Sequence, residues 1–446
     1  MKKIKNVLLV QMTTSKWYAN KKNYKLTRIP PIGILSISSY LRMNGFPNTR
    51  VIDFSANRSE NSVTYTRDTY RDIIVKNDID VVGISVYAES YRHALELAKF
   101  TSEINPKIKI LVGGAFATFT ADEFLGNEYI DFAVIGEGEV TMLELMLHFN
   151  YPDQFPLAAI KGLAFKNEQG KVQINPRRNP IKNLDVLPLY DRAQDNSDYY
   201  EPSINSSRGC PGNCIYCSSR AMWGKKYRRR SSESVFSEIY YLHKKHGEIS
   251  KLNFAEDTFT ASPARVRAIC RMIKAAGIKL KFWCESRVDV LTKDLLKEMQ
   301  EAGLLSVQIG IESGVQEIID SINKNITLEK VEQVLQWIKE LGIYRVHCGF
   351  MIGHPLDTHE TVQRTIDFAN YIQKEYGASV EVGINTPFPG TFEFDHADEL
   401  GLKIHTYDWN QYVLYQGIMD TKHLTRDDLH RYVLKFREKN RPVQTT

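Results

Sequence analysis

Three of the six cysteines lie in one short stretch, at Cys210, Cys214 and Cys217. The C-x3-C-x2-C spacing places three thiols on one loop, and thiolates are soft ligands suited to an iron–sulfur cluster. A cubane cluster normally takes four protein ligands, so three cysteines leave one iron open for chemistry. The alternative is a zinc site or a set of buried thiols. Zinc sites more often use paired C-x2-C units with a fourth Cys or His, and this sequence holds no second pair.

Repeated strand-and-helix units follow the cysteine loop and must position it. The expected strands are residues 204–206, 251–254, 281–284, 306–311, 345–350 and 379–384. Amphipathic helices with capping residues at their starts and glycines at their ends separate them. Six such units predict a partial (βα)6, TIM-like barrel with the cysteine loop after its first strand. Functional side chains should gather at the carboxyl ends of the strands.

The first third of the chain alternates short apolar runs with amphipathic helices, which predicts a doubly wound, Rossmann-like parallel sheet. In such sheets ligands bind beyond the carboxyl ends of the strands. Small residues stand at those expected ends, where the backbone can approach a ligand closely. They are Ser85, Gly113, Gly114, Gly136 and Gly138.

Length and composition fit an α/β protein of several domains: 446 residues, 43% hydrophobic and 25% charged, which excludes a disordered or fibrous chain. We expect a first domain over residues 1–150, a linker with a β-hairpin over 151–203, the barrel over 204–390 and a small helical extension over 391–446. The net charge of +5 is mild. Residues 225–230 form a local basic run, which is either a solvated surface or a site for anionic groups.

The cysteine loop, with Tyr216 directly before its third cysteine, resembles the signature of the radical S-adenosylmethionine (SAM) superfamily. This resemblance implies a [4Fe–4S] cluster on the three cysteines, whose open iron chelates SAM and whose electron cleaves it to a 5′-deoxyadenosyl radical. The first third resembles the cobalamin (B12)-binding domain that precedes many radical SAM cores, on PPIGIL at 30–35, GIS at 83–85, VGG at 112–114 and IGEGE at 135–139. The D-x-H-x-x-G motif of proteins with a histidine on cobalt is absent. A degenerate domain without cobalamin stays open as an alternative.

The same resemblance implies SAM contacts for Tyr216, for the acidic pair Glu256 and Asp257, for Arg287, which would take the carboxylate, and for Glu312. The structural alternative for each charged residue is a strand-end ion pair. Strand alternation also points polar side chains into the barrel. We take these as substrate candidates: Gln308, His347, Glu381 and Asn385.

These features together imply a cobalamin-dependent radical SAM enzyme that methylates an unactivated carbon of a biosynthetic precursor through methylcobalamin. Cyclisation, ring contraction or rearrangement without net methylation is the alternative. Methylthiolation of tRNA is rejected because the first third has no cysteine. A cobalamin sensor without catalysis would not need the cysteine loop.

The expected partners are a small-molecule or peptide substrate and an external electron donor of the flavodoxin or ferredoxin type. No nucleic acid is expected. No apolar run is long enough to span a bilayer, so we expect no membrane and a cytoplasmic location, where thiols stay reduced.

Overall fold

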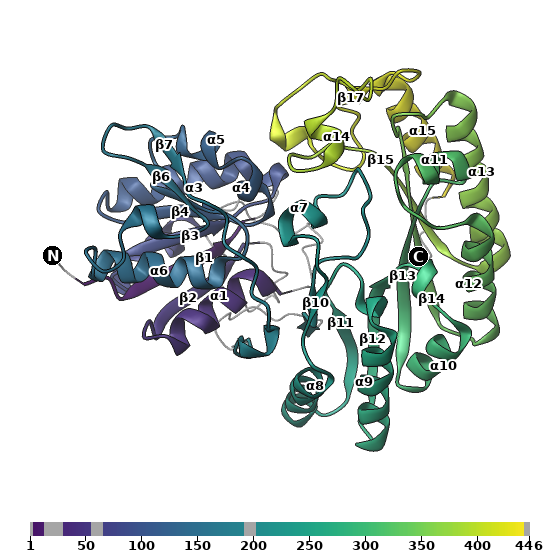
Figure 1. Cartoon of the computed structure of the whole chain (residues 1–446), viewed down its shortest axis with the longest axis horizontal. Helices are drawn as coiled ribbons and strands as arrows, with labels where there is room; N and C mark the ends of the chain where they lie inside the picture. The colour runs from purple at the N-terminus through teal and green to yellow at the C-terminus, as the bar shows by residue number, and fades with distance from the viewer. Residues whose placement is uncertain (1–2, 13–29, 55–65, 191–201, 441–446) are drawn as a thin grey trace. The chain divides into compact units, whose positions relative to one another are not determined.

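The computed structural model describes residues 3–12, 30–54, 66–190 and 202–440. The chain divides into two compact units, residues 1–203 and 204–446 (Figure 1). Each unit has its own sheet and its own hydrophobic core.

The first unit is a parallel sheet with a hairpin at one edge. Its elements are β1 (Asn6–Gln11), α1 (Ile32–Met43), β2 (Asn48–Asp53), α2 (Arg67–Lys76), β3 (Val81–Ser85), α3 (Tyr91–Ile104), β4 (Lys109–Gly113), α4 (Ala115–Phe119), α5 (Ala121–Leu125), β5 (Phe132–Val134), α6 (Gly138–Asn150), β6 (Leu163–Lys166) and β7 (Val172–Ile174). The strand order is β2-β1-β3-β4-β5-β6-β7. Strands β1 to β5 pair in parallel, and the order reverses between β1 and β3. This confirms the doubly wound parallel sheet, a fold in which ligands generally bind beyond the carboxyl ends of the strands.

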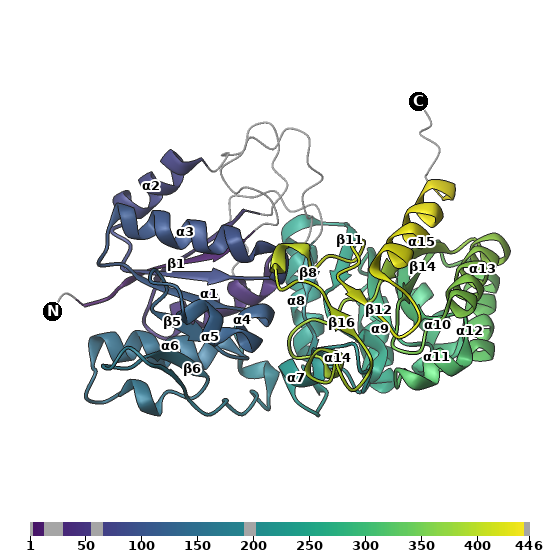
Figure 2. The same ribbon diagram turned by 90° about the horizontal axis from the view of Figure 1, so that it is seen from above.

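Helices cover both faces of this sheet. Figure 2 shows α2 and α3 on one face and α1 and α6 on the other. Strand β1 explains why: Val7, Leu8, Leu9 and Val10 are all at most 2% exposed. Such a continuous apolar run requires burial on both sides, as parallel sheets provide.

The expected linker is wrong for residues 151–190. Strand β6 pairs antiparallel with β5 and also with β7, so the hairpin continues the first sheet. Leu163 and Ala164 are fully buried there. The physical reason is that an apolar strand next to an open sheet edge is stabilised by pairing with it. Residues 191–201 of the expected linker lie outside the described residues.

The second unit is built around a six-stranded sheet with helices on its outside. Its elements are β8 (Ser203–Ile204), β9 (Ser207–Arg208), α7 (Ser219–Trp223), β10 (Arg228–Arg229), α8 (Ser232–His246), β11 (Ile249–Phe254), α9 (Pro263–Ala275), β12 (Leu280–Ser286), α10 (Lys293–Glu301), β13 (Leu304–Glu312), α11 (Gln316–Ser321), α12 (Leu328–Glu340), β14 (Arg345–Ile352), α13 (His359–Tyr376), β15 (Ser379–Ile384), α14 (Phe392–Asp395), β16 (Lys403–Ile404), β17 (Met419–Asp420) and α15 (Arg426–Lys439). The order β15-β14-β13-β12-β11-β8, with parallel pairing from β11 to β15, confirms the partial barrel.

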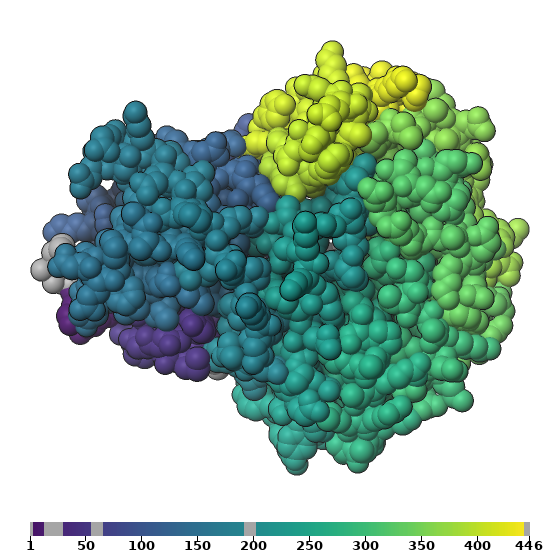
Figure 3. Space-filling model, in the orientation of Figure 1, coloured from purple at the N-terminus to yellow at the C-terminus, as the bar shows by residue number. Residues whose placement is uncertain are grey.

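The C-terminal extension is part of the second unit's core. Helix α15 begins after Thr425, whose hydroxyl accepts a hydrogen bond from the Asp428 amide. Leu429, Val433 and Phe436 of this helix join the barrel's hydrophobic core. In the space-filling view the yellow extension lies directly against the green barrel helices (Figure 3). Among the described residues, no helix has the length and apolarity needed to cross a membrane.

Candidate active site

The cysteine loop lies between β9 and α7, and short-range pairing closes it. Strand β9 ends at Arg208, two residues before Cys210, and pairs antiparallel with β10. Within the loop, the Ile215 amide donates to the Ile322 carbonyl at 3.2 Å, and the Ile215 carbonyl accepts from the Glu393 amide at 3.2 Å. The loop is therefore bound on two sides by the barrel and by the C-terminal extension.

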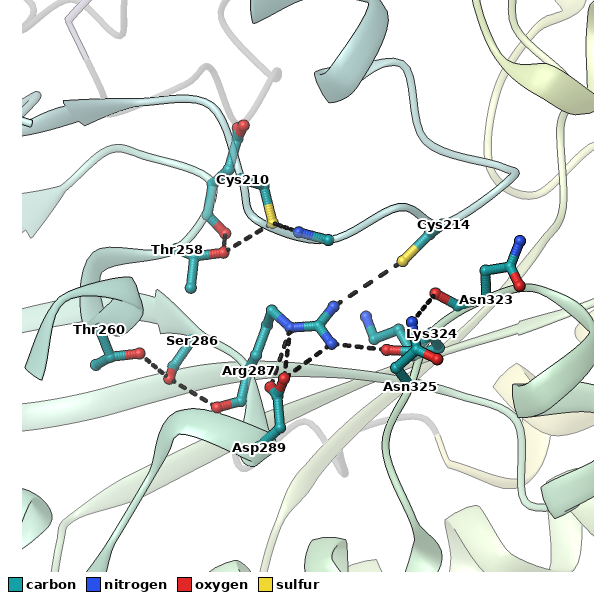
Figure 4. A network of polar contacts seen from close by, with 12 residues as sticks. Cys210, Cys214, Thr258, Thr260, Ser286, Arg287, Asp289, Asn323, Lys324 and Asn325 are labelled. Carbon is teal, nitrogen blue, oxygen red and sulfur yellow. Dashed lines mark hydrogen bonds and ion pairs between the residues drawn. The ribbon is translucent and has the colours of Figure 1, made fainter. Parts of the chain in front are cut away.

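Each of the three sulfurs is within reach of a hydrogen-bond donor. The Ser219 amide lies 3.4 Å from Cys217 Sγ, and the Gly212 amide lies 3.4 Å from Cys210 Sγ. Arg287 Nη1 lies 4.0 Å from Cys214 Sγ (Figure 4). The Thr258 hydroxyl is also 3.2 Å from Cys210 Sγ. Donors to sulfur stabilise thiolates and tune the potential of an iron–sulfur cluster.

Arg287 is the link between the loop and the third barrel strand. It is 8% exposed, and its guanidinium pairs with Asp289 at 3.0 Å while Nη2 donates to the Lys324 carbonyl at 2.6 Å. A side chain at Gly212 would come within 3.0 Å of Arg287 Nη1, so glycine permits this approach. The strand-end ion pair is confirmed, because Arg287 pairs with Asp289. Its Nη1 group faces Cys214 Sγ at 4.0 Å, and the SAM contact stays a prediction.

A buried ion pair lies beside Arg287. Lys324 Nζ is 2.7 Å from Glu312 Oε1 and 3.2 Å from the Tyr216 hydroxyl. Burial alone would lower the pKa of Lys324, but the Glu312 carboxylate and the Cys214 sulfur raise it. Burial and the Glu312 charge raise the pKa of the Tyr216 phenol. The tyrosine is thereby kept neutral and the lysine charged.

The backbone around this pair is strained. Glu312, Asn323 and Asn325 have φ values of 75°, 55° and 55°, in the left-handed region that costs energy for residues other than glycine. A side chain at Gly310 would come within 2.3 Å of Glu312 Oε1, so the glycine leaves room for the ion pair. Strain of this kind concentrates at functional sites.

The two acidic residues after β11 have different environments. Both Glu256 oxygens are taken, by the amide and hydroxyl of Ser206 at 2.6 and 2.8 Å and by Arg265 at 3.4 Å. The cofactor contact expected of Glu256 is therefore wrong, because its carboxylate is committed to holding the strand before the loop. Asp257 is exposed instead and accepts a short hydrogen bond from the Ser219 hydroxyl beside Cys217.

Three of the four substrate candidates lie on the inward face of the sheet. Gln308 and His347 are direct partners on β13 and β14, and Glu381 on β15 accepts from the Tyr415 hydroxyl. Burial lowers the pKa of His347, and Arg345 and Lys251 lower it further.

Asn385 does not fit a role in substrate contact. It is 1% exposed, and its amide donates to Glu393 Oε2 at 2.8 Å. Glu393 is itself fully buried beside His354, whose Nδ1 lies 4.0 Å from Glu393 Oε1 and whose ring lies 5.7 Å from that of Tyr216. The amide of Asn385 is used to satisfy a buried carboxylate, which otherwise would cost several kcal/mol. Asn385 therefore supports the extension that binds the cysteine loop.

In the first unit, the glycine and serine candidates meet at the predicted sheet edge. Ser85 ends β3 and is the direct partner of Gly113, which ends β4. Gly114 has φ 98° and packs against Ser85 Oγ, and Gly136 has φ 78° and donates its amide to the Thr118 hydroxyl. Gly138 is different, because a side chain there would come within 2.6 Å of Ile37 Cδ1 on α1. It permits close helix packing.

Sequence reasoning missed Glu285, Lys324, His354 and Glu393. Lys324 carries a signal, since asparagines on both sides favour left-handed turns. Glu285 shares the inward face with Gln308, its direct partner. Burial raises its pKa to about 7, with Asp257 raising it and Lys324 opposing. Cys284 and Cys348 are buried in the core, and burial raises the pKa of both thiols.

The donor set fits an iron–sulfur cluster: three thiols on one loop, each near an N–H or O–H group, with a guanidinium beside one of them. Within the described parts of the chain, no three His, Cys, Asp or Glu side chains are grouped so as to hold a single metal ion.

Comparisons with known proteins match both units. The radical SAM superfamily model matches residues 204–369 and the B12-binding domain model residues 26–146. An uncharacterized methyltransferase from Pyrococcus horikoshii is 32% identical over 91% of this chain and 86% of that protein. An anaerobic magnesium-protoporphyrin IX monomethyl ester cyclase from Rubrivivax gelatinosus is 27% identical over 90% and 71%. The solved structure of the radical SAM methyltransferase TsrM from Kitasatospora setae, with cobalamin and a [4Fe–4S] cluster bound, is 20% identical and matches in fold with a TM-score of 0.72 over 91% and 78% of the two chains. The chain belongs to the radical SAM superfamily, as an enzyme with a B12-binding domain ahead of its radical SAM core and with an iron–sulfur cluster, SAM and cobalamin as its cofactors.

Proposed function

We propose that this enzyme methylates an unactivated carbon of a small biosynthetic precursor through methylcobalamin. The observation that carries the proposal is the convergence of Arg287, Lys324, Glu312 and Tyr216 on one side of the cysteine loop. The Pyrococcus relative is named as a methyltransferase, which supports transfer of a methyl group. When bound, the cluster supplies the electron, SAM the hydrogen-abstracting group and cobalamin the methyl group.

The residues of this chain then bind and orient. Arg287 offers a guanidinium to the carboxylate of SAM, because charge-assisted pairs of this kind are strong and directional. Asp257 is the acidic group that remains available for the amine, since Glu256 is committed elsewhere. Lys324 holds Glu312 and Tyr216 in place. Ser85, Gly113, Gly114 and Gly136 would approach cobalamin with their backbone.

The inward face of the barrel sheet would take the substrate. Gln308 and His347 offer an amide and a mostly neutral imidazole, and Glu285 offers a carboxyl that is partly protonated near neutrality. These groups can hold hydroxyl, amine or amide groups without placing a full charge against the substrate. Glu381, already bonded to Tyr415, would form the edge of this face.

Cyclisation or rearrangement without net methylation is the second candidate, and the Rubrivivax relative, named as a cyclase, favours it. Methyl transfer from SAM carrying a deuterated methyl group to cob(I)alamin separates the two. A methylating enzyme should form deuterated methylcobalamin, detected by mass spectrometry, before any substrate is added. If only 5′-deoxyadenosine appears and cobalamin stays unlabelled, the methyltransferase proposal is wrong. Cys214→Ala is the control for the radical reaction, because this variant should form no 5′-deoxyadenosine.

A further inference from the structure

The segment that carries the cysteine loop is strongly basic. Between Arg208 and Ser232 the sequence holds seven basic residues and no acidic one, although the whole chain has a net charge of only +5. Arg208, Arg228 and Arg230 are buried, each at most 9% exposed. Arg208 and Arg228 are direct partners in the β9–β10 hairpin, and Arg230 forms an ion pair with Glu238 of α8. The other four basic residues of the segment are not buried, so packing does not explain their positive charge.

These four residues, which we call the basic rim, are exposed: Arg220, Lys225, Lys226 and Arg229. Among the described residues, none of them lies within ion-pair distance of an acidic side chain; Arg220 donates to the Asn213 side chain. Surface cations without acidic neighbours produce a positive potential that attracts an acidic partner and speeds its encounter.

The basic rim lies close to the cluster ligands along the chain and in space. Helix α7, which holds Arg220, begins two residues after Cys217, and β10, which holds Arg229, pairs with β9 just before Cys210. Cys217 is itself exposed. The cluster edge at this cysteine is thus the edge that an external protein can approach.

The form of the basic rim favours a protein over a small anion. Its four cations stand on α7, on the following turn and on β10, all exposed. A small anionic ligand is usually held by convergent, partly buried donors, whereas a broad exposed charge pattern suits the polar rim of a transient protein interface.

We propose that the basic rim is the docking surface for an acidic one-electron carrier protein of the flavodoxin class. One electron passes from the reduced flavin, which is oxidised by one electron, to the cluster, which is reduced by one electron; no covalent bond forms or breaks. This proposal rests on the proposed function, which requires a reduced cluster.

The test compares two pairs of adjacent exposed lysines. K225E/K226E reverses two charges of the basic rim, and K244E/K245E reverses two in the last turn of α8, about 18–20 Å along that helix from its start. Both variants change the net charge equally. Reduced flavodoxin is mixed anaerobically with each reconstituted protein at low salt, and bleaching of the cluster is followed. The rim variant should be reduced at least ~10-fold more slowly and the control within ~2-fold of wild type. Salt should remove the difference.

Two further measurements separate the possible failures. Dithionite, which needs no docking surface, should reduce both variants like wild type. Binding of oxidised flavodoxin to the protein before reconstitution should weaken at least tenfold in the rim variant. Equal slowing in both variants, or unchanged flavodoxin binding in the rim variant, overturns the proposal. A wild type that retains no iron would refute the proposed function instead.

Discussion

Replacement of Lys324 by methionine should destabilise the second unit strongly. The ammonium lies 2.7 Å from the Glu312 carboxylate and 3.2 Å from the Tyr216 hydroxyl, and the two charged residues are 7% and 8% exposed. Methionine fills a similar volume but leaves Glu312 buried without a counter-charge, which costs about 3–5 kcal/mol. Loss of the bond to Tyr216 adds about 1 kcal/mol.

A double-mutant cycle isolates the ion pair from other effects. Lys324→Met and Glu312→Gln should each destabilise, and the double variant should be more stable than the sum of the two predicts, with a coupling energy of about 2–3 kcal/mol. Lys339→Met is the matched control, because its pair with Glu375 is about half exposed and such pairs contribute less than about 1 kcal/mol.

Urea unfolding followed by tryptophan fluorescence measures these differences. Four of the five tryptophans lie after residue 203, so the signal reports mainly on the second unit. An unfolding free energy within about 1 kcal/mol of wild type for Lys324→Met, similar to the surface control, would refute the argument that the pair is buried and coupled. If the changes in unfolding free energy of the two single variants simply add in the double variant, the coupling between Lys324 and Glu312 is refuted.

Three further predictions follow from individual contacts. Glu256→Gln should lower the urea midpoint of unfolding without weakening SAM binding. Asp257→Asn should weaken SAM binding with little effect on stability. Urea unfolding measures the stability, and equilibrium dialysis measures SAM binding. Burial in the folded chain raises the pKa of Glu285 from 4.5 to about 7, so this carboxyl keeps a proton that the unfolded chain loses. The free energy of unfolding should therefore fall by up to about 3 kcal/mol as pH rises from 4.5 to 7. Glu285→Gln should lack that part of the fall, and a pH dependence of unfolding equal to wild type would contradict the prediction. Asn385→Leu leaves Glu393 without its donor and should cost about 1–3 kcal/mol, with the KM for substrate unchanged; a raised KM at unaltered stability would return Asn385 to substrate contact.

The sequence predicts most of the framework because the framework depends on periodicity. Alternating apolar residues over 379–384 predict a strand, and the structure has that strand with the same bounds, Ser379–Ile384. The hairpin at β6 and β7 was also predicted, but its membership of the first sheet was not. Which edge a strand joins depends on non-local pairing, and no local pattern encodes it.

In the candidate site, too, local sequence patterns predict some residues, while others depend on contacts that are distant in the sequence. Three soft ligands at fixed spacing have few other uses, so the cysteines can be predicted from their spacing alone. The SAM contact of Arg287 is predicted only through the resemblance to radical SAM enzymes. Glu256 and Asp257 are neighbouring carboxylates, and only their hydrogen-bond partners show which one is available to a cofactor. Ser206, fifty residues earlier, donates to Glu256 and so occupies its carboxylate. Lys324 lies on a loop, so no alternation of faces indicated that it reaches Glu312.

The most direct test of the central claim, that one chain holds both cofactors of a B12-dependent radical SAM enzyme, is metal analysis after anaerobic reconstitution with iron, sulfide and hydroxocobalamin. After desalting, wild type should retain about four irons and about one cobalt per chain, and Cys214→Ala should lose iron while keeping cobalt. Iron without cobalt would contradict cobalamin binding by the first unit, and iron retained unchanged by Cys214→Ala would contradict the assignment of the cysteine loop.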